Sequence, residues 1–310
     1  METKRTVKEG AIFRPMPQRF LLPRIQGLGR MEVNMPPPIF NTHDFSRVRR
    51  RRVVWWWFLL LAGALWLGCA FVVRAADEDA LQDLWKQHTA TPDDHDALIK
   101  ACGEFAQAHA GDPLLPVVRG LEEWHRLKAG QKAEWQQMLT ADLALPAGAL
   151  NDGARRLALA WMTRVDREQV AAALQGYYRK QVAYPKSLDL VAAAKPPMTD
   201  RFGKPWVYRL TGFAKVPGFT DQKYSLQSAL LGDASELKTA VQLPYAARIK
   251  AVPMQVVAGP ANAPAVKFNF GGSAGVVAVG QSAGELFLAY VGTQIVVVCD
   301  FTHWKIQPRP

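Results

Sequence analysis

Hydrophobic and polar residues recur with different periods along this chain, and these periods divide it into segments. An uninterrupted apolar run covers Val53–Val73, about the length that a helix needs to cross a hydrocarbon core of ~30 Å. From Asp77 to about Val182, apolar residues recur at spacings of three and four, which predicts amphipathic helices. After Pro185 the pattern changes to short β-rich runs separated by Gly and Pro turns. The chain therefore predicts an α+β protein that follows a transmembrane helix.

The flanks of the apolar run are typical of a membrane anchor. Basic residues precede it and tryptophans occupy its first turn: Arg49, Arg50, Arg51, Arg52, Trp55, Trp56 and Trp57. Because basic flanks stay in the cytoplasm, residues 1–52 are expected to be a disordered cytoplasmic arm of a single-pass inner-membrane protein. Most of the chain is then periplasmic. The alternative is a signal peptide that is cleaved near Ala75, which leads to export.

The helical region, residues 77–170, is expected to consist of short antiparallel helices. Thr91–Asp94 offers a capping residue, a proline and acids suited to a helix start, and Gly111–Pro113 separates that helix from the next. Further helices are predicted at Glu134–Leu139, Ala154–Thr163 and Glu168–Val182. The arrangement resembles tetratricopeptide-type hairpins, although the chain shows no second copy of that repeat's signature.

Two strand-rich modules are expected after the helices, at residues 171–240 and 241–310. In the first, a helix precedes strands around Trp206–Tyr208 and Tyr224–Leu226, where aromatic residues favour β structure. In the second, short apolar runs separated by glycines predict an all-β module. These runs are Gln255–Val257, Val266–Phe268, Val276–Val279, Glu285–Tyr290, Ile295–Cys299 and Trp304–Ile306.

A set of aromatic, turn and polar residues in the first strand-rich module carries a family resemblance. In chain order they are Tyr184, Pro185, Asp200, Phe202, Gly203, Pro205, Trp206, Tyr208, Tyr224 and Ser228. Together with the helix before them, they make residues 174–232 resemble the C-terminal globular domain of the major pseudopilin of type II secretion systems. The residues also suggest a structure independently of the family. Pro185 disfavours helix at the residue before it, and a period of two places Trp206 and Tyr208 on one face.

The resemblance implies a small sheet packed on one helix, in a protein that contacts other proteins of a secretion or pilus-type assembly. This chain departs from the family near its N-terminus, because the apolar run lacks the pilin cleavage signature and a helical region follows it. The family binds calcium after the serine strand, and here Asp233 and Glu236 are the remaining candidate ligands. Since Ca²⁺ takes six or more oxygen ligands, no metal cofactor is expected.

The last segment, residues 271–310, resembles the small β-domain of the inner-membrane connector protein of the same machinery in its run of short strands. That family also combines a short cytoplasmic arm, a single span and a periplasmic β-domain. The resemblance implies partners among other envelope or secretion-assembly proteins. Trp206, Tyr208, Tyr224 and Trp304 are the aromatic candidates for packing or for contact with such partners.

The charge of the chain is concentrated at its N-terminal end. The whole chain has 38 Lys and Arg and 27 Asp and Glu, a formal net charge of +11. Residues 1–74 contain 13 of the basic and four of the acidic residues, so the remainder is nearly neutral. The basic excess therefore suits membrane orientation and anionic lipid rather than nucleic acid. In an oxidising compartment, Cys102 and Cys299 are either two buried thiols or one bridge between domains.

Several local patterns suggest enzymes or metal sites. Gly271–Gly275 and Gly280–Gly284 match the Gly-x-Ser-x-Gly pattern of serine hydrolases, but β-rich runs follow where that fold needs a helix. We therefore expect glycine-rich turns at both places. Asp93–Asp96 suits the start of a helix better than a metal site. The histidines have no ligand-like spacing to one another along the sequence.

These observations favour a non-enzymatic, membrane-anchored envelope protein that binds other proteins of a type II secretion or pilus-type assembly. No cofactor, nucleic acid or small-molecule substrate is expected. Two alternatives remain open. One is a periplasmic helical-repeat adaptor that binds peptides, and the other is an exported serine hydrolase that uses Ser282.

Overall fold

The computed structural model describes residues 76–216 and 219–310. The expected cytoplasmic arm and apolar run lie outside the described residues, and so do the anchor residues Arg49–Arg52 and Trp55–Trp57. In the two ranges described, none of the helices has both the length and the apolar content that a membrane crossing requires. Helices are combined with antiparallel sheets, which confirms the α+β class.

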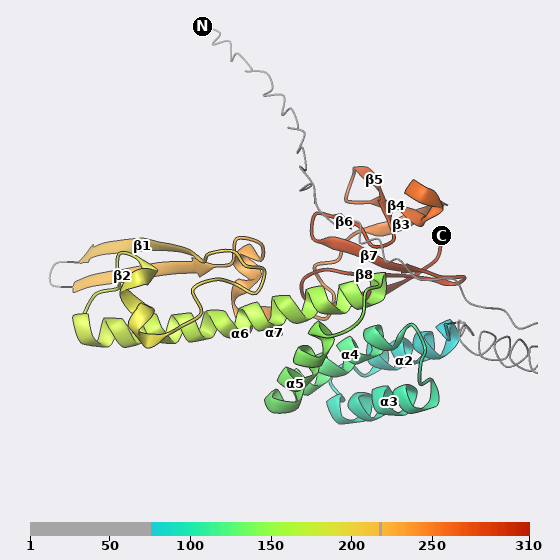
Figure 1. The fold of residues 1–310 in the computed structure, drawn as a ribbon, viewed down its shortest axis with the longest axis horizontal. Helices are drawn as coiled ribbons and strands as arrows, with labels where there is room; N and C mark the ends of the chain where they lie inside the picture. Colours follow the sequence, from blue (N-terminus) through green and yellow to red (C-terminus); the bar gives the residue numbers. More distant parts are fainter. Residues whose placement is uncertain (1–75, 217–218) are drawn as a thin grey trace, which may run out of the picture. The chain divides into compact units, whose positions relative to one another are not determined.

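The helical region is a series of antiparallel helices in which each packs against the next (Figure 1). They are α2 (Glu78–Ala90), α3 (His95–Ala108), α4 (Leu115–Lys128), α5 (Lys132–Leu143) and α6 (Ala149–Gln181). The helix predicted at Thr91–Asp94 begins later than expected. The Thr91 N–H bonds to the Gln87 carbonyl and closes α2, and Asp94 caps α3 by accepting from the Ala97 N–H at 3.3 Å.

Helix α6 is 33 residues long and replaces the two separate helices that were predicted at 154–163 and 168–182. The polar stretch between them resembles a loop in the sequence, but its side chains have partners on other elements. Arg164 donates to the Ala234 and Phe301 carbonyls, and Arg167 donates to the Leu226 carbonyl. These bonds explain why the helix continues. The domain boundary expected at residue 170 consequently falls inside α6.

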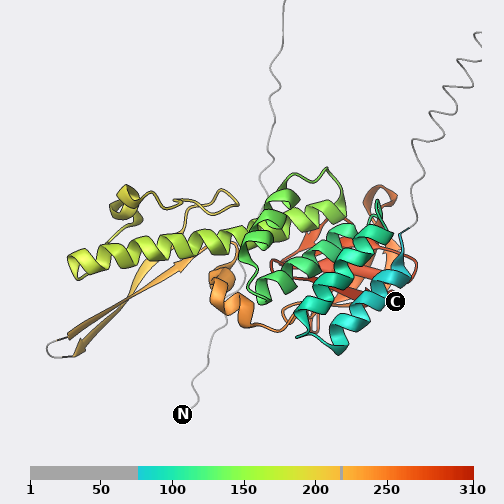
Figure 2. The same cartoon turned by 90° about the horizontal axis from the view of Figure 1, so that it is seen from below.

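After α6, the chain forms a β-hairpin that lies beside the C-terminal part of this helix (Figures 1 and 2). A 3₁₀ helix, η1 (Leu188–Ala194), precedes the antiparallel strands β1 (Val207–Val216) and β2 (Phe219–Gln227). The short helices η2 (Gly232–Ser235) and α7 (Leu237–Gln242) follow them. We call residues 170–235 the hairpin module and the other described residues the body.

The remaining strands form two antiparallel sheets in the order β3-β4-β5 and β6-β7-β8-β9. In the first sheet are β3 (Val252–Ala258), β4 (Pro264–Asn269) and β5 (Ala274–Ala278), with η3 (Pro260–Asn262) between β3 and β4. In the second are β6 (Ser282–Ala283), β7 (Leu286–Val291), β8 (Ile295–Cys299) and β9 (Trp304–Pro308). The strands expected at residues 255–306 are therefore confirmed, with small changes in their ends.

Strand β8 is buried on both faces, which explains its unbroken run of apolar residues. Ile295, Val297 and Cys299 belong to a core formed with α2, α3, α4 and α6. Val296 and Val298 belong to a second core, shared with the three-stranded sheet. The helical region and the last strands are thus joined by one hydrophobic core (Figure 2).

Trp304 on β9 fits into a gap between helices α4 and α6. The gap exists because each helix has a glycine, without a side chain, at this point. Gly120 of α4 and Gly153 of α6 both contact its ring so closely that a Cβ at either position would collide with it. Trp304 is fully buried, so its role is packing. Cys102 and Cys299 belong to the same core as free, buried thiols and are not bridged.

Glu78, at the start of α2, connects the N-terminal end of the described chain to the last sheet. Its carboxylate accepts from the backbone N–H groups of Thr293, Gln294 and Ile295, in the turn between β7 and β8, and from the Tyr290 hydroxyl. Burial raises the pKa of Glu78, but these hydrogen bonds outweigh burial, and the net pKa is lowered.

Candidate functional site

Two of the motif residues, Phe202 and Ser228, bond to the carboxylate of a third, Asp200. Asp200 Oδ1 accepts from the Phe202 N–H at 3.0 Å and the Lys204 N–H at 2.8 Å. Asp200 Oδ2 accepts from the Ser228 hydroxyl at 2.6 Å, which connects the turn to the end of β2. Gly203 has φ +75°, a left-handed conformation that glycine adopts without strain. The Asp-x-Phe-Gly sequence therefore specifies this turn.

Aromatic side chains join the hairpin to α6 and to the loop after it. Trp206 Nε1 donates to the Pro197 carbonyl, and the Tyr208 hydroxyl donates to the Pro185 carbonyl, each at 2.8 Å. Tyr184 and Tyr224 pack with their ring centroids 4.7 Å apart. These residues surround a core that includes Leu174 of α6. Burial raises the pKa of Tyr208 to about 12, so this phenol is neutral at physiological pH.

The motif residues are thus brought together, and the described contacts give them packing and hydrogen-bonding roles. Phe202 packs against Phe301 of the body. The exposed large apolar side chains of the module do not belong to the motif. Four of the exposed large apolar residues in the described chain lie in or next to its loops: Val182, Leu190, Met198 and Leu230. The unpaired strand edges and these residues make up the candidate interaction surface.

The two calcium candidates are engaged in local hydrogen bonds. Asp233 accepts from Gln227 Nε2 at 2.6 Å, and Glu236 accepts from the Thr239 hydroxyl at 2.7 Å. Throughout residues 76–216 and 219–310, no group of three or more potential metal ligands has a metal-binding arrangement.

The residues of the hydrolase alternative take part in other contacts. Ser282 Oγ accepts from Arg156 at 3.2 Å. Asp300 Oδ1 accepts from the Thr302 and His303 N–H groups and fixes the turn before β9. His303 is buried against Trp124 and Tyr245, and burial lowers its pKa to about 3. The strand β7 follows Ser282, where a nucleophile elbow requires a helix.

Three histidines form a hydrogen-bonded chain that their positions in the sequence did not indicate. His88 Nδ1 lies 3.1 Å from His125 Nε2, and His95 Nδ1 lies 3.0 Å from His125 Nδ1. Because His125 uses its two ring nitrogens in different directions, the three side chains do not converge on one metal position. Burial lowers the pKa of His88 to about 4 and that of His125 to about 3.

A buried acidic pair between α4 and α5 was also missed by sequence reasoning. Glu123 and Asp142 are both buried, and Arg119 forms an ion pair with Asp142 at 2.6 Å. Burial, followed by the charge of Asp142, raises the pKa of Glu123 well above its ordinary value. A side-chain hydrogen bond with Asp142 raises the pKa of Glu123 as well. A single sequence gives no local signal for such a pair, because its members belong to different helices.

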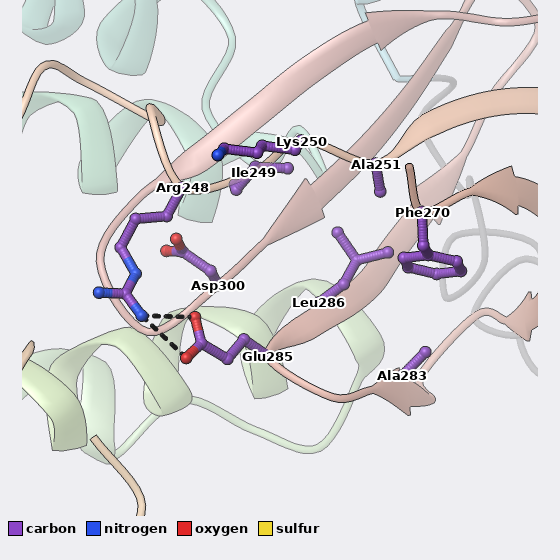
Figure 3. A pocket seen from close by; sticks show the side chains of 9 residues that line it. All are labelled: Arg248, Ile249, Lys250, Ala251, Phe270, Ala283, Glu285, Leu286 and Asp300. Carbon is purple, nitrogen blue, oxygen red and sulfur yellow. Dashed lines mark hydrogen bonds and ion pairs between the residues drawn. The ribbon is translucent and has the colours of Figure 1, made fainter. Parts of the chain in front are cut away.

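A cavity of about 190 Å³ lies where the segment before β3 meets the four-stranded sheet (Figure 3). We call it the junction pocket. Its apolar wall consists of Ile249, Ala251, Phe270, Ala283 and Leu286. Its polar side contains Asp300 and the ion pair in which Arg248 Nη2 donates to both oxygens of Glu285, at 2.9 and 3.0 Å.

Comparison with protein-family models, curated proteins and solved structures gives no match for this chain.

Proposed function

We propose that this protein is a membrane-anchored, non-enzymatic envelope component that binds partner proteins of a type II secretion or pilus-type assembly through its hairpin module. One observation carries the proposal. The motif residues that resemble the pseudopilin domain are spread over 45 positions, from Tyr184 to Ser228, yet hydrogen bonds and packing hold them along α6, from the Asp200 turn beside Asp166 to the aromatic cluster around Leu174.

The strands of the module offer a way to bind a partner. In the described part of the chain, β1 and β2 pair only with each other, so each has one edge without a neighbouring strand. An unpaired edge presents backbone N–H and C=O groups that a partner strand satisfies by β-augmentation. The exposed side chain of Leu230, just after β2, adds apolar contact area beside this hairpin, and Leu190 on η1 adds exposed apolar area elsewhere on the module.

Site-specific photocrosslinking in cells tests the proposal. A photoreactive amino acid replaces Leu190 or Leu230 in the full chain, and Ala133 on α5 of the body is the control, because it is an exposed apolar residue that does not line the junction pocket. We expect crosslinks to envelope proteins from the two module positions and none from the control position. Equal crosslinking from all three positions contradicts the proposal. A reporter fused after Pro310 tests on which side of the membrane this part of the chain lies, and activity only in the cytosol would also contradict the proposal.

One observation favours the helical-repeat adaptor as a second candidate function. A groove of about 520 Å³ lies between the α3–α4 and α5–α6 turns, with apolar side chains such as Leu115, Leu145 and Leu150 along it. An exposed apolar groove of this kind is a candidate binding surface for a peptide. If Ala149→Arg in the groove abolishes partner capture while the crosslinks at Leu190 and Leu230 are absent, the adaptor function replaces the hairpin proposal.

The serine hydrolase alternative has a direct test as well. A fluorophosphonate probe labels an activated serine, and Ser282→Ala abolishes that labelling only if Ser282 is the nucleophile. The hydrogen bond from Arg156 to Ser282 provides no general base, so we expect no labelling of either protein.

A further inference from the structure

Asp300 is the polar group of the junction pocket that the protein itself leaves incompletely satisfied. Its side chain is 97% buried, since its relative exposure is 3%. Oδ1 accepts from the Thr302 N–H, the Thr302 hydroxyl and the His303 N–H. Oδ2 is buried and has no hydrogen-bond partner in the described chain. Since Asp300 lines the cavity, a group that enters it meets an acceptor without a donor.

The charges around Asp300 select among possible donors. Arg156 and Arg164 lie close enough to attract its carboxylate, and Arg248 and Lys250 line the same cavity. Glu285 is paired with Arg248. A cationic ligand would be repelled by this surplus of positive charge, and an anionic ligand would be repelled by the Asp300 carboxylate. A neutral O–H or N–H donor avoids both repulsions.

The rest of the pocket restricts the size and shape of the occupant. A volume of about 190 Å³ is of the order that holds one aromatic ring. Phe270 and Leu286 provide an apolar wall opposite the polar side (Figure 3). Arg248 bonds to Glu285 through Nη2 alone, so its other nitrogens remain able to donate to an oxygen. A phenol combines a ring, an O–H that donates to Asp300 and an oxygen that accepts from Arg248.

We infer that the junction pocket binds a phenol group, the side chain of a tyrosine that a partner protein inserts between the two sheets. Tyrosine is well suited to such a position because it combines a large apolar area with one polar atom. The inference depends on the proposed function only for the source of the group, since binding of a phenol itself requires no secretion partner.

Binding of small phenols to the full chain in detergent tests the pocket directly. By ligand-observed NMR, p-cresol should bind about fivefold more tightly than toluene, because only p-cresol has a hydroxyl that donates a hydrogen bond to Asp300. Equal affinities, or no binding of either compound, overturn the inference.

Asp300→Asn provides the sharpest protein variant. The asparagine Oδ1 keeps the bonds that fix the turn before β9, while an Nδ2 donor replaces Oδ2, the acceptor that is unpaired among the described residues. We expect the preference for p-cresol over toluene to fall in this variant, because Nδ2 cannot accept the phenol O–H and can only compete with Arg248 for the phenol oxygen. The preference should be unchanged in Ser282→Ala, which changes a residue outside the pocket. An undiminished preference in Asp300→Asn contradicts the assignment.

The source of the phenol is tested separately. Ala283→Phe fills the pocket, so it should abolish both p-cresol binding and the capture of partners that crosslink at Leu190 or Leu230. If p-cresol binding is lost but capture is unchanged, a partner's tyrosine is not the occupant. Because crosslinking at the hairpin module is scored independently, failure of the proposed function and failure of this inference remain distinguishable.

Discussion

The body and the hairpin module share helix α6, but they differ in how far apart along the sequence the residues are that stabilise each of them. In the module, Tyr208 bonds to Pro185 across 23 positions, and Ser228 bonds to Asp200 across 28. In the body, Glu78 bonds to the Thr293 N–H across 215 positions. The module is thus specified by neighbouring sequence, whereas the body requires both ends of the described chain.

This difference has a consequence for stability. The two strands of the module pack on one side of α6, and a two-stranded sheet has little stability of its own. In the body, β8 is buried on both faces between helices and a second sheet. Local opening therefore costs less free energy in the module than in the body, and substitutions in each region should show this.

Trp304→Ala should have the largest effect, because it empties the gap between α4 and α6 in the middle of the body. We expect a loss of about 3–5 kcal/mol in the free energy of unfolding, measured by chemical denaturation. The gap collapses poorly, since helix backbone at Gly120 and Gly153 lines it. A loss below about 1 kcal/mol would show that the body does not depend on this contact.

Gly153→Ala should destabilise the protein by about 2–3 kcal/mol, because the new methyl group collides with the buried Trp304 ring. Gly176→Ala is the matched control on the same helix. Among the described residues, no atom outside its own stretch of helix lies within 4 Å of the position of its Cβ, so it should stabilise the protein by about 0.5–1 kcal/mol through helix propensity. Thermal unfolding of both variants gives the comparison, and equal effects would contradict it.

Glu78→Gln should remove about 2 kcal/mol of stability at pH 7, because the amide replaces an acceptor of several hydrogen bonds. The pKa of Glu78 is lowered in the folded state, so its contribution is present above the ordinary value of 4.5 and is lost as the pH falls through the folded value. Denaturation from pH 7 to pH 3 should show the two proteins converging at acidic pH. A difference that is independent of pH would refute the role of the charge.

Tyr208→Phe should have the smallest destabilising effect, about 1 kcal/mol, because it deletes one hydrogen bond to the Pro185 carbonyl and keeps the ring in place. Hydrogen exchange should accelerate in β1 and β2 while β8 stays protected. Exchange that accelerates equally in β8 would show that the module and the body open as one unit, and the distinction between them would fail.

The sequence predicted most elements and the motif turn. Gly111–Pro113 separates α3 from α4 as expected, and the helix does end before Tyr184. These features depend on the backbone conformation of a few adjacent residues, which glycine and proline restrict directly. The prediction of separate helices at 154–163 and 168–182 was wrong, because the partners that satisfy Arg164 and Arg167 lie on distant elements.

By itself, the sequence determined where helices, strands and turns form, because their backbone hydrogen bonds and restricted conformations are local. The tertiary structure alone decided which side chains meet. It placed Trp304 between Gly120 and Gly153, joined His88, His95 and His125, and left Asp300, which lines a cavity, with one oxygen unpaired in the described chain. Such contacts connect residues that are far apart along the chain, so only the packing of complete elements fixes them.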